Sequence, residues 1–373
     1  MAKRTRLAGT AAALIPLAVL VAACSSSSST PAASTSASGS SAAGAASAPT
    51  SGTLTENGSG VMFPLVNLWE KGYVKQYPGV KISTTSSNSS TGVTDAGQGL
   101  VDIGASDNSM SATQTTQYPS LENIPLGADG IDIMYNLPGL KAPLNLSGTL
   151  LAQIYDGKIT TWNDPAIAKA NPGVTLPSTK IVTVHRADSA AASLLLAEYM
   201  NAQDAADWPT ALVASTPAWP KTSGALAETG AGAMVTGAGS AVGSISYTGS
   251  SYGTQIKAAK LSTAALLNGG GKYQTVTTAS VGAAVDSFPA PPASGKESLI
   301  NTTAAAGYPI TGYEYAIVST QQKSSTQAAL IQNFLTWAIT TGSTDTYLSQ
   351  VGFVPLPAAT ATVSKNLIAQ ISS

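Results

Sequence analysis

The single histidine and the only arginine beyond the first six residues are neighbours, at His185 and Arg186. Asp188 follows two positions later, on the same side of an extended segment, where it can hold the guanidinium by hydrogen bonds. A guanidinium held in this way presents a planar fork of donors that matches a tetrahedral oxyanion. The pattern predicts an anion-binding arginine, and a purely structural ion pair is the alternative.

Four short stretches combine turn residues, hydroxyl groups and a charge at points where a strand is expected to pass into a helix. They are G-S-G-V-M-F-P (58–64), S-S-N-S-S-T-G (86–92), D-I-G-A-S-D (102–107) and H-R-A-D-S-A-A-A-S (185–193). The first turn of a helix carries unpaired N–H groups and the positive end of the helix dipole. These stretches therefore predict a local site for a small anion that needs no broad basic surface.

Catalytic and metal sites are disfavoured by the residue content. A serine nucleophile would have to use His185 as its base, since the chain has no other imidazole. A zinc site lacks its ligands, because one cysteine and one histidine are present in the whole chain. We expect no enzyme activity, no bound metal and no cofactor.

Seven stretches then carry a resemblance to a known family. They are G-S-G-V-M-F-P (58–64), V-D-I-G-A-S-D (101–107), M-Y-N-L-P-G-L (134–140), L-S-G-T-L-L-A-Q-I-Y-D-G-K-I-T-T-W-N-D-P-A-I (146–167), N-P-G-V-T-L-P (171–177), V-H-R-A-D (184–188) and V-G-F-V-P-L-P (351–357). With these stretches in this order, the region from about 56 to 357 resembles the phosphate-binding lipoproteins of bacterial high-affinity phosphate ABC importers. The resemblance implies an α/β, two-lobed periplasmic-binding-protein (type II) fold, in which each lobe is a mainly parallel sheet flanked by helices and the ligand cleft lies between the lobes.

The resemblance also implies which residues bind phosphate. The family uses a Thr-Phe pair, a Ser, an Asp, an Arg, a second Asp and a Ser-Gly-Thr turn. The matching positions are Met62, Phe63, Ser89, Asp107, Arg186, Asp188, Ala190, Ala191 and Ala192. Methionine thus replaces the family's threonine, and three alanines replace its Ser-Gly-Thr turn. The backbone N–H groups survive these changes, but about three hydroxyl donors are lost, at a cost of roughly 4–9 kcal/mol unless water or nearby hydroxyls replace them.

Asp107 has a discriminating role if this site is intact. A carboxylate in an anion site accepts a hydrogen bond from a protonated ligand and repels a fully ionised one. It therefore favours hydrogen phosphate over sulfate. A helix N-cap is the alternative role for this aspartate.

Hydrophobic patterning supplies the elements that must position these residues. Strands are expected at 79–85, 101–106, 130–136, 180–185, 241–247 and 314–318. Helices are expected from Pro64 to about Tyr77, after Asp188, and from about Ser324 to Thr341. Strands that alternate with helices imply α/β layers with a largely parallel sheet, while 222–255 is too irregular for more than one helix and one strand.

The two lobes are expected at 53–129 with 308–373, and at 130–307, because the chain of a type II binding protein crosses twice between lobes. This division places Phe63, Ser89 and Asp107 on one lobe and Arg186 and Asp188 on the other. A bound anion would then bridge the cleft and stabilise its closure.

The N-terminal residues have the features of an exported, lipid-anchored protein. Residues 1–23 combine a basic start with an apolar run, which is typical of a signal peptide. Cys24 ends a stretch that resembles a lipobox, so we expect a lipid on its sulfur, and 24–52 is a Ser/Ala-rich tether. This organisation places the protein in the cell envelope, on the outer face of the cytoplasmic membrane.

The mature chain is weakly acidic, with 15 basic residues against 19 acidic ones once Lys3, Arg4 and Arg6 are removed. This balance argues against nucleic acid as a partner. The family resemblance implies that the protein captures inorganic phosphate and delivers it to the ABC permease subunits of an importer. The alternative is a surface lipoprotein that has lost phosphate and binds another solute, or acts as a sensor or adhesion module.

Overall fold

The structure of the protein is a computed structural model that describes residues 51–140 and 143–373. The predicted signal peptide, the lipidated Cys24 and nearly all of the tether lie outside the described residues. In the described ranges, no helix combines the length and hydrophobicity that a bilayer crossing requires.

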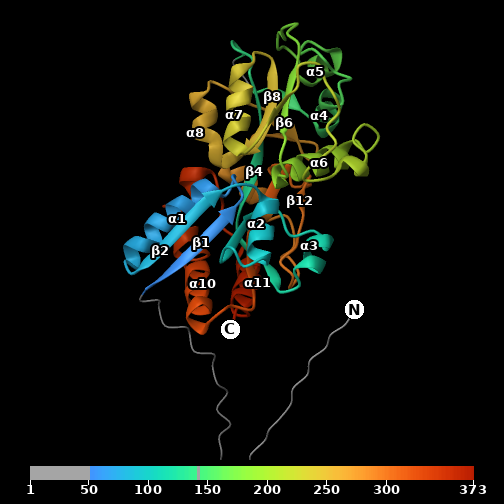
Figure 1. Ribbon diagram of the computed structural model, residues 1–373. Coiled ribbons are helices and arrows are strands. Elements are labelled where there is room, and N and C mark those ends of the chain that lie inside the picture. The colour runs from blue at the N-terminus through green and yellow to red at the C-terminus, as the bar shows by residue number, and fades with distance from the viewer. Residues whose placement is uncertain (1–50, 141–142) are drawn as a thin grey trace, which may run out of the picture. The chain divides into compact units, whose positions relative to one another are not determined.

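The element order alternates strands and helices through most of the chain (Figure 1). The strands are β1 (Gly52–Gly58), β2 (Val80–Ser86), β3 (Ile103–Ser106), β4 (Leu121–Tyr135), β5 (Asn145–Leu146), β6 (Val182–Arg186), β7 (Leu226–Glu228), β8 (Ser244–Gly249), β9 (Ser262–Thr263), β10 (Ala265–Leu267), β11 (Tyr273–Gln274), β12 (Leu299–Ile300) and β13 (Ile310–Ser319). The helices are α1 (Phe63–Gln76), α2 (Ser89–Gly97), α3 (Ala112–Gln117), α4 (Gly148–Tyr155), α5 (Pro165–Ala170), α6 (Ala191–Gln203), α7 (Ala231–Ser240), α8 (Gly253–Ala258), α9 (Thr278–Val285), α10 (Ser325–Ala338) and α11 (Ala358–Ile368).

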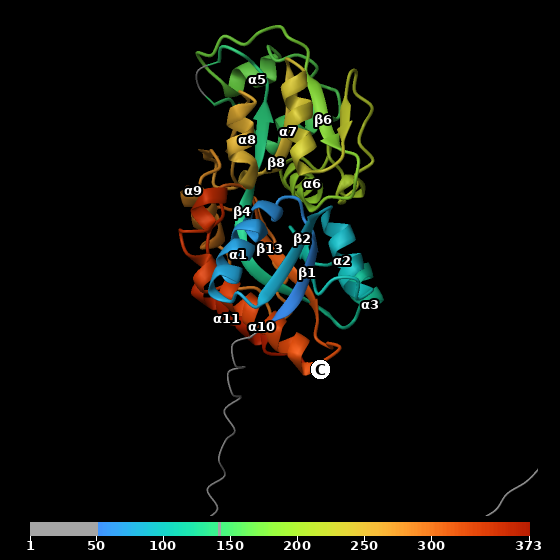
Figure 2. The same cartoon turned by 60° about the vertical axis from the view of Figure 1, so that its left-hand side comes forward.

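The long strand β4 connects two groups of elements (Figure 2). Its first half pairs with β13, and its second half pairs with β8. The main sheet has the order β2-β1-β3-β13-β4-β8-β6-β7. Strands β1, β2 and β3 pair in parallel, as do β6, β7 and β8, but β13 and β4 pair antiparallel with their neighbours in this order. The sheet is therefore mixed where we expected it to be largely parallel, because β13 runs antiparallel to β3 and to β4, and β4 runs antiparallel to β8.

The predicted helices are confirmed close to their expected bounds. In α1, Leu65, Val66, Trp69 and Tyr73 are buried at helical spacing, and the chain leaves the helix before Pro78. The helices expected after Asp188 and from about residue 324 are α6 and α10.

Two parts of the chain are more regular than the patterning indicated. Strand β1 was not predicted, because Glu56 occupies an inward position between Leu54 and Gly58 and is itself buried. The segment 222–255 contains β7, α7 and β8, since its small residues let α7 lie close to the sheet. A Cβ atom at Gly237, for example, would come within 2.7 Å of the Glu228 side chain.

The buried apolar residues form two clusters. One contains Leu54, Trp69 and Phe334 and joins α1, β1 and α10. The other contains Trp162, Leu196 and Tyr247 and joins β4, β8, α4 and α6. The second cluster also takes in residues of β13, so the lobe boundaries at residues 129–130 and 307–308 stay a prediction.

Candidate functional site

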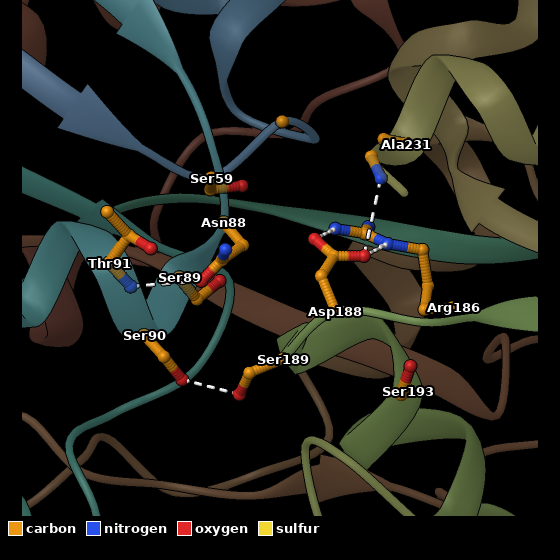
Figure 3. A network of polar contacts seen from close by, with 12 residues as sticks. Ser59, Asn88, Ser89, Ser90, Thr91, Arg186, Asp188, Ser189, Ser193 and Ala231 are labelled. Atoms are coloured by element: carbon orange, nitrogen blue, oxygen red, sulfur yellow. Dashed lines mark hydrogen bonds and ion pairs between the residues drawn. The ribbon is translucent and has the colours of Figure 1, made fainter. Parts of the chain in front are cut away.

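Arg186 is the last residue of β6 and is almost wholly buried, with 4 % of its surface exposed. Its Nε atom donates to Oδ1 of Asp188 at 2.6 Å, and its Nη2 atom donates to the other carboxylate oxygen (Figure 3). The Gly230 N–H donates to the same Oδ1 at 3.3 Å. The predicted pair between Arg186 and Asp188 is confirmed, and it fixes the guanidinium at the carboxyl end of a strand that lies inside the sheet.

Each member of this pair stabilises the ionised form of the other. Burial alone would lower the pKa of Arg186, but the hydrogen bonds and charge of Asp188 outweigh it and raise the pKa. Burial likewise disfavours ionised Asp188, yet Arg186 holds the pKa of that carboxyl below its usual value. Both side chains are therefore ionised at neutral pH.

The start of α6 lies directly after this pair and has free donors. The N-cap residue, Ala190, makes no side-chain cap, and its own N–H donates to the Ser215 carbonyl at 2.9 Å. The N–H groups of Ala191 and Ala192 have no hydrogen-bond acceptor within the described part of the chain, although these residues are only 2 % and 1 % exposed. A buried, uncapped helix start is rare in proteins because its donors remain unsatisfied. An acceptor from outside the chain would satisfy them.

The start of α2 faces the start of α6. Asn88 caps α2 by accepting the Thr91 N–H at 2.9 Å. Ser90 Oγ lies 2.6 Å from Ser189 Oγ, so a direct hydrogen bond joins segments 99 residues apart in sequence (Figure 3). A cavity of about 280 Å³ borders both helix starts and is lined in part by Ser89, Ser90 and Ala191. The two predicted helix-start stretches are thus brought together.

Asp107 follows β3 and is 3 % exposed. Its N–H donates to Ser89 Oγ at 3.3 Å, and its Oδ1 atom has no hydrogen-bond partner in the described residues. Burial raises the pKa of Asp107 to about 7, against the opposing charge of Arg186. The alternative role as a helix N-cap is wrong, because Ser111 caps the helix that follows.

The first predicted stretch contributes less than we expected. Ser59 Oγ accepts the N–H groups of Val61 and Met62, each at 3.0 Å, and the Phe63 N–H donates to the Ser59 carbonyl at 3.1 Å. These backbone donors are therefore already engaged in a turn before α1. The Met62 side chain belongs to the apolar cluster around Leu54, so it does not fill the anion site.

The nearby hydroxyl groups are also largely engaged. Ser193 Oγ hydrogen-bonds to the Tyr247 hydroxyl at 2.7 Å inside the protein, and that hydroxyl also accepts the Arg186 N–H at 3.1 Å. Ser189 Oγ contacts Ser215 Oγ at 2.9 Å as well as Ser90. The hydroxyl of Ser193, which is close in sequence to the lost Ser-Gly-Thr turn, is thus engaged with Tyr247 and not with the site.

Neither Ser251 nor His185 is placed to act in catalysis. The stretch 249–253 has Gly-x-Ser-x-Gly spacing, but its Ser251 hydroxyl is buried and donates to the Val61 carbonyl at 2.7 Å. His185 is half-buried with its ring centroid 5.2 Å from that of Trp219, and burial lowers its pKa.

Two buried acidic residues near Asp107 were missed by the sequence reasoning. Asp129 on β4 and Glu314 on β13 are both fully buried. The signal that could have revealed them is a charged residue inside each of two strands that are otherwise buried on both faces.

Comparisons with known proteins agree with this architecture. Residues 43–341 match a family model described as a PBP superfamily domain. The chain is 30% identical over 319 residues to the phosphate-binding protein PstS of Xylella fastidiosa strain 9a5c, covering 85% of this chain and 83% of that protein. It is also 30% identical over 342 residues to PstS of Methanocaldococcus jannaschii, covering 86% of this chain and 87% of that protein.

Solved structures show the same fold. A phosphate-binding protein from Stenotrophomonas maltophilia aligns with a TM-score of 0.65 and 21% identity over 85% of this chain and 94% of that chain. The high-affinity periplasmic phosphate-binding protein PfluDING aligns with a TM-score of 0.68 and 22% identity over 85% of this chain and 93% of that chain. The fold is the two-lobed α/β fold of periplasmic binding proteins. From its sequence relatives and the matched family model, this chain belongs to the PstS family of phosphate-binding proteins.

Proposed function

We propose that this protein captures inorganic phosphate between its two lobes and delivers it to the permease subunits of an ABC importer. It acts by binding and not by catalysis, from the outer face of the cytoplasmic membrane, where a lipid on Cys24 anchors it. The phosphate ligands are the Arg186 guanidinium, the backbone N–H groups at the starts of α6 and α2, and the Asp107 carboxylate.

The observation that carries this proposal is the buried start of α6. Ala191 and Ala192 present two unsatisfied N–H groups beside an ionised arginine that Asp188 holds in place. A small anion satisfies the N–H groups, the helix dipole and the guanidinium at once. The alanine side chains do not prevent this, because the donors belong to the backbone.

The competing function is a binding protein that has lost phosphate. It is favoured by the alanines at 190–192, which lack the family's hydroxyls, and by the engagement of the Met62 and Phe63 N–H groups with Ser59. Calorimetric titration of the purified protein with phosphate, sulfate and organic phosphates separates the two functions. Phosphate binding at micromolar concentrations supports the proposal. If phosphate gives no heat and another anion binds, the protein has lost phosphate and the competing function is correct.

Selectivity for a protonated anion provides a sharper test. We expect Asp107→Asn to reduce the preference for phosphate over sulfate by about tenfold or more, because the amide no longer repels a fully ionised ligand and can donate to it. The measurement is the ratio of the two dissociation constants at neutral pH. Asp345→Asn, at an exposed position, serves as the control. An unchanged ratio in the Asp107 variant would contradict this role.

A further inference from the structure

Three carboxyl groups come together next to Arg186, from three different strands. Asp107 follows β3, Asp129 lies on β4 and Glu314 lies on β13, and they are 3 %, 0 % and 0 % exposed. Asp107 Oδ1 and both carboxyl oxygens of Asp129 and of Glu314 have no hydrogen-bond partner among the described residues. Buried polar atoms without partners are uncommon in folded proteins, so this cluster requires a physical explanation.

The strand register explains how the cluster fits inside the protein. In the antiparallel pair of β4 and β13, Asp129 lies opposite Gly312, and Glu314 lies opposite Gly127. The two carboxyl side chains are therefore diagonal neighbours on one face, and each has a glycine across from it. A Cβ atom at Gly312 would lie 3.4 Å from the Asp107 carbonyl, so Asp107 covers the same face.

The charges of this cluster do not balance if every carboxyl is ionised. The groups that face it are Asp132 on β4, Tyr308 before β13, Tyr315 on β13, Tyr252 after β8, and Arg186. Arg186 supplies the positive charge in this set, and Asp188 already pairs with it. Buried carboxylates in contact cannot all stay ionised, because each disfavours the charge of the next.

A proton on Glu314 accounts for both the excess negative charge of the cluster and its carboxyl oxygens without hydrogen-bond partners. Burial, together with the charges of Asp107 and Asp129, raises the pKa of Glu314 well above its usual value. Its carboxyl lies next to both aspartates, because Asp129 is its diagonal neighbour on β4 and Asp107 directly follows Ser106, which pairs with Tyr315. Two carboxylates cannot bond to each other, but a protonated Glu314 can donate to one of them. That donation lowers the pKa of Asp107 and so favours its ionised form.

We propose that Glu314 is a positioning residue that holds a proton next to Asp107 and keeps the Asp107 carboxylate ionised as the acceptor for a protonated oxyanion. This inference rests on the proposed function, because it assigns Asp107 to the ligand. Glu314 itself does not contact the anion. Its contribution is to set the pH above which Asp107 can accept the ligand's hydrogen.

The test compares two replacements of similar size. Glu314→Gln keeps a donor beside Asp107 but cannot ionise, whereas Glu314→Met removes the donor. We expect the Gln variant to bind inorganic phosphate within about threefold of the wild-type affinity at pH 7, and the Met variant to bind about tenfold or more weakly. We also expect the pH at which phosphate binding rises to move upward in the Met variant, because the pKa of Asp107 rises when the donor is lost.

A matched control separates this role from a general effect of a buried acid. Glu56 on β1 is also buried at 4 % exposure, has an unpartnered Oε2 atom and has a pKa raised to about 8, mainly by burial. Glu56→Gln is expected to leave the pH profile of phosphate binding unchanged. Equal losses in the Gln and Met variants of Glu314, or a wild-type pH profile in the Met variant, would overturn the proposal.

A second measurement does not depend on phosphate binding. The carboxyl carbon of Asp107 can be followed by NMR through a pH titration, with Asp107→Asn to assign its signal. We expect its midpoint near pH 7 in the wild type and at least about one pH unit higher in Glu314→Met. A wild-type protein that fails to bind phosphate would refute the proposed function, whereas an unmoved Asp107 midpoint would refute the role of Glu314.

Discussion

Replacing Arg186 with glutamine is expected to abolish high-affinity phosphate binding. The change leaves Asp188 and the buried Asp107 without their counter-charge, so an incoming anion meets two carboxyl groups and no cation. Losing one partner of a buried, hydrogen-bonded charge pair at a binding interface costs about 2–5 kcal/mol, which corresponds to a loss of roughly 30- to 5,000-fold in affinity. Calorimetry with phosphate at neutral pH measures this loss.

Two further variants make the Arg186 result specific. Lys158→Gln removes a cation from an exposed ion pair with Asp207 and is expected to leave phosphate binding unchanged. Arg186→Gln combined with Asp188→Asn leaves no unpaired charge at this pair. If the double variant folds with wild-type stability and still does not bind phosphate, the loss reflects the missing guanidinium and not a damaged fold. Wild-type affinity in Arg186→Gln would contradict the site.

The substitution Ala191→Pro is expected to weaken phosphate binding by about 10- to 100-fold while α6 stays intact. Ala191 is the first residue of α6, where proline is tolerated because that N–H is not needed inside the helix. The preceding Ala190 has φ −130° and ψ 134°, an extended conformation that proline accepts in the residue before it. The substitution removes one N–H donor to a charged ligand, which is worth roughly 1.5–3 kcal/mol.

The control for this prediction is proline at the first position of another helix. Ser325 begins α10 after an extended N-cap, Ser324, and is exposed. Ser325→Pro is expected to preserve both stability and phosphate binding. Circular dichroism and thermal unfolding verify that both variants stay folded, and calorimetry then compares their affinities. Unchanged affinity in Ala191→Pro would mean that the start of α6 does not hold the anion.

Much of the candidate site follows from local sequence. Arg186 and Asp188 are two positions apart at the end of an extended segment, so a hydrogen-bonded pair needs only the local chain direction. The start of α6 is also readable, because apolar residues recur at helical spacing after it, and the start of α2 is marked by the turn residues and hydroxyls of 86–92 that follow a predicted strand. The chemistry of an anion site was therefore predictable from short stretches.

Local sequence was less informative about which donors stay free. Ser59 captures the N–H groups of Val61 and Met62, and Ser193 bonds to Tyr247 from a strand 54 residues away. Both outcomes depend on which side-chain oxygen lies within hydrogen-bonding distance of each donor. The closeness of an N–H or hydroxyl group to the site in sequence therefore did not predict whether that group is free to bind a ligand.

The alternation of strands and helices, the arginine-aspartate pair and the helix starts could be predicted from local sequence, because they depend on neighbours within one or two turns. The mixed sheet, the contact between Ser90 and Ser189, and the meeting of Asp107, Asp129 and Glu314 depend on contacts between segments far apart in the chain. For the acidic residues of β4 and β13, the decisive contact is the register between these two strands. Asp129 and Glu314, which are 185 positions apart in the chain, become diagonal neighbours there, and the glycines opposite them leave room for buried carboxyl groups.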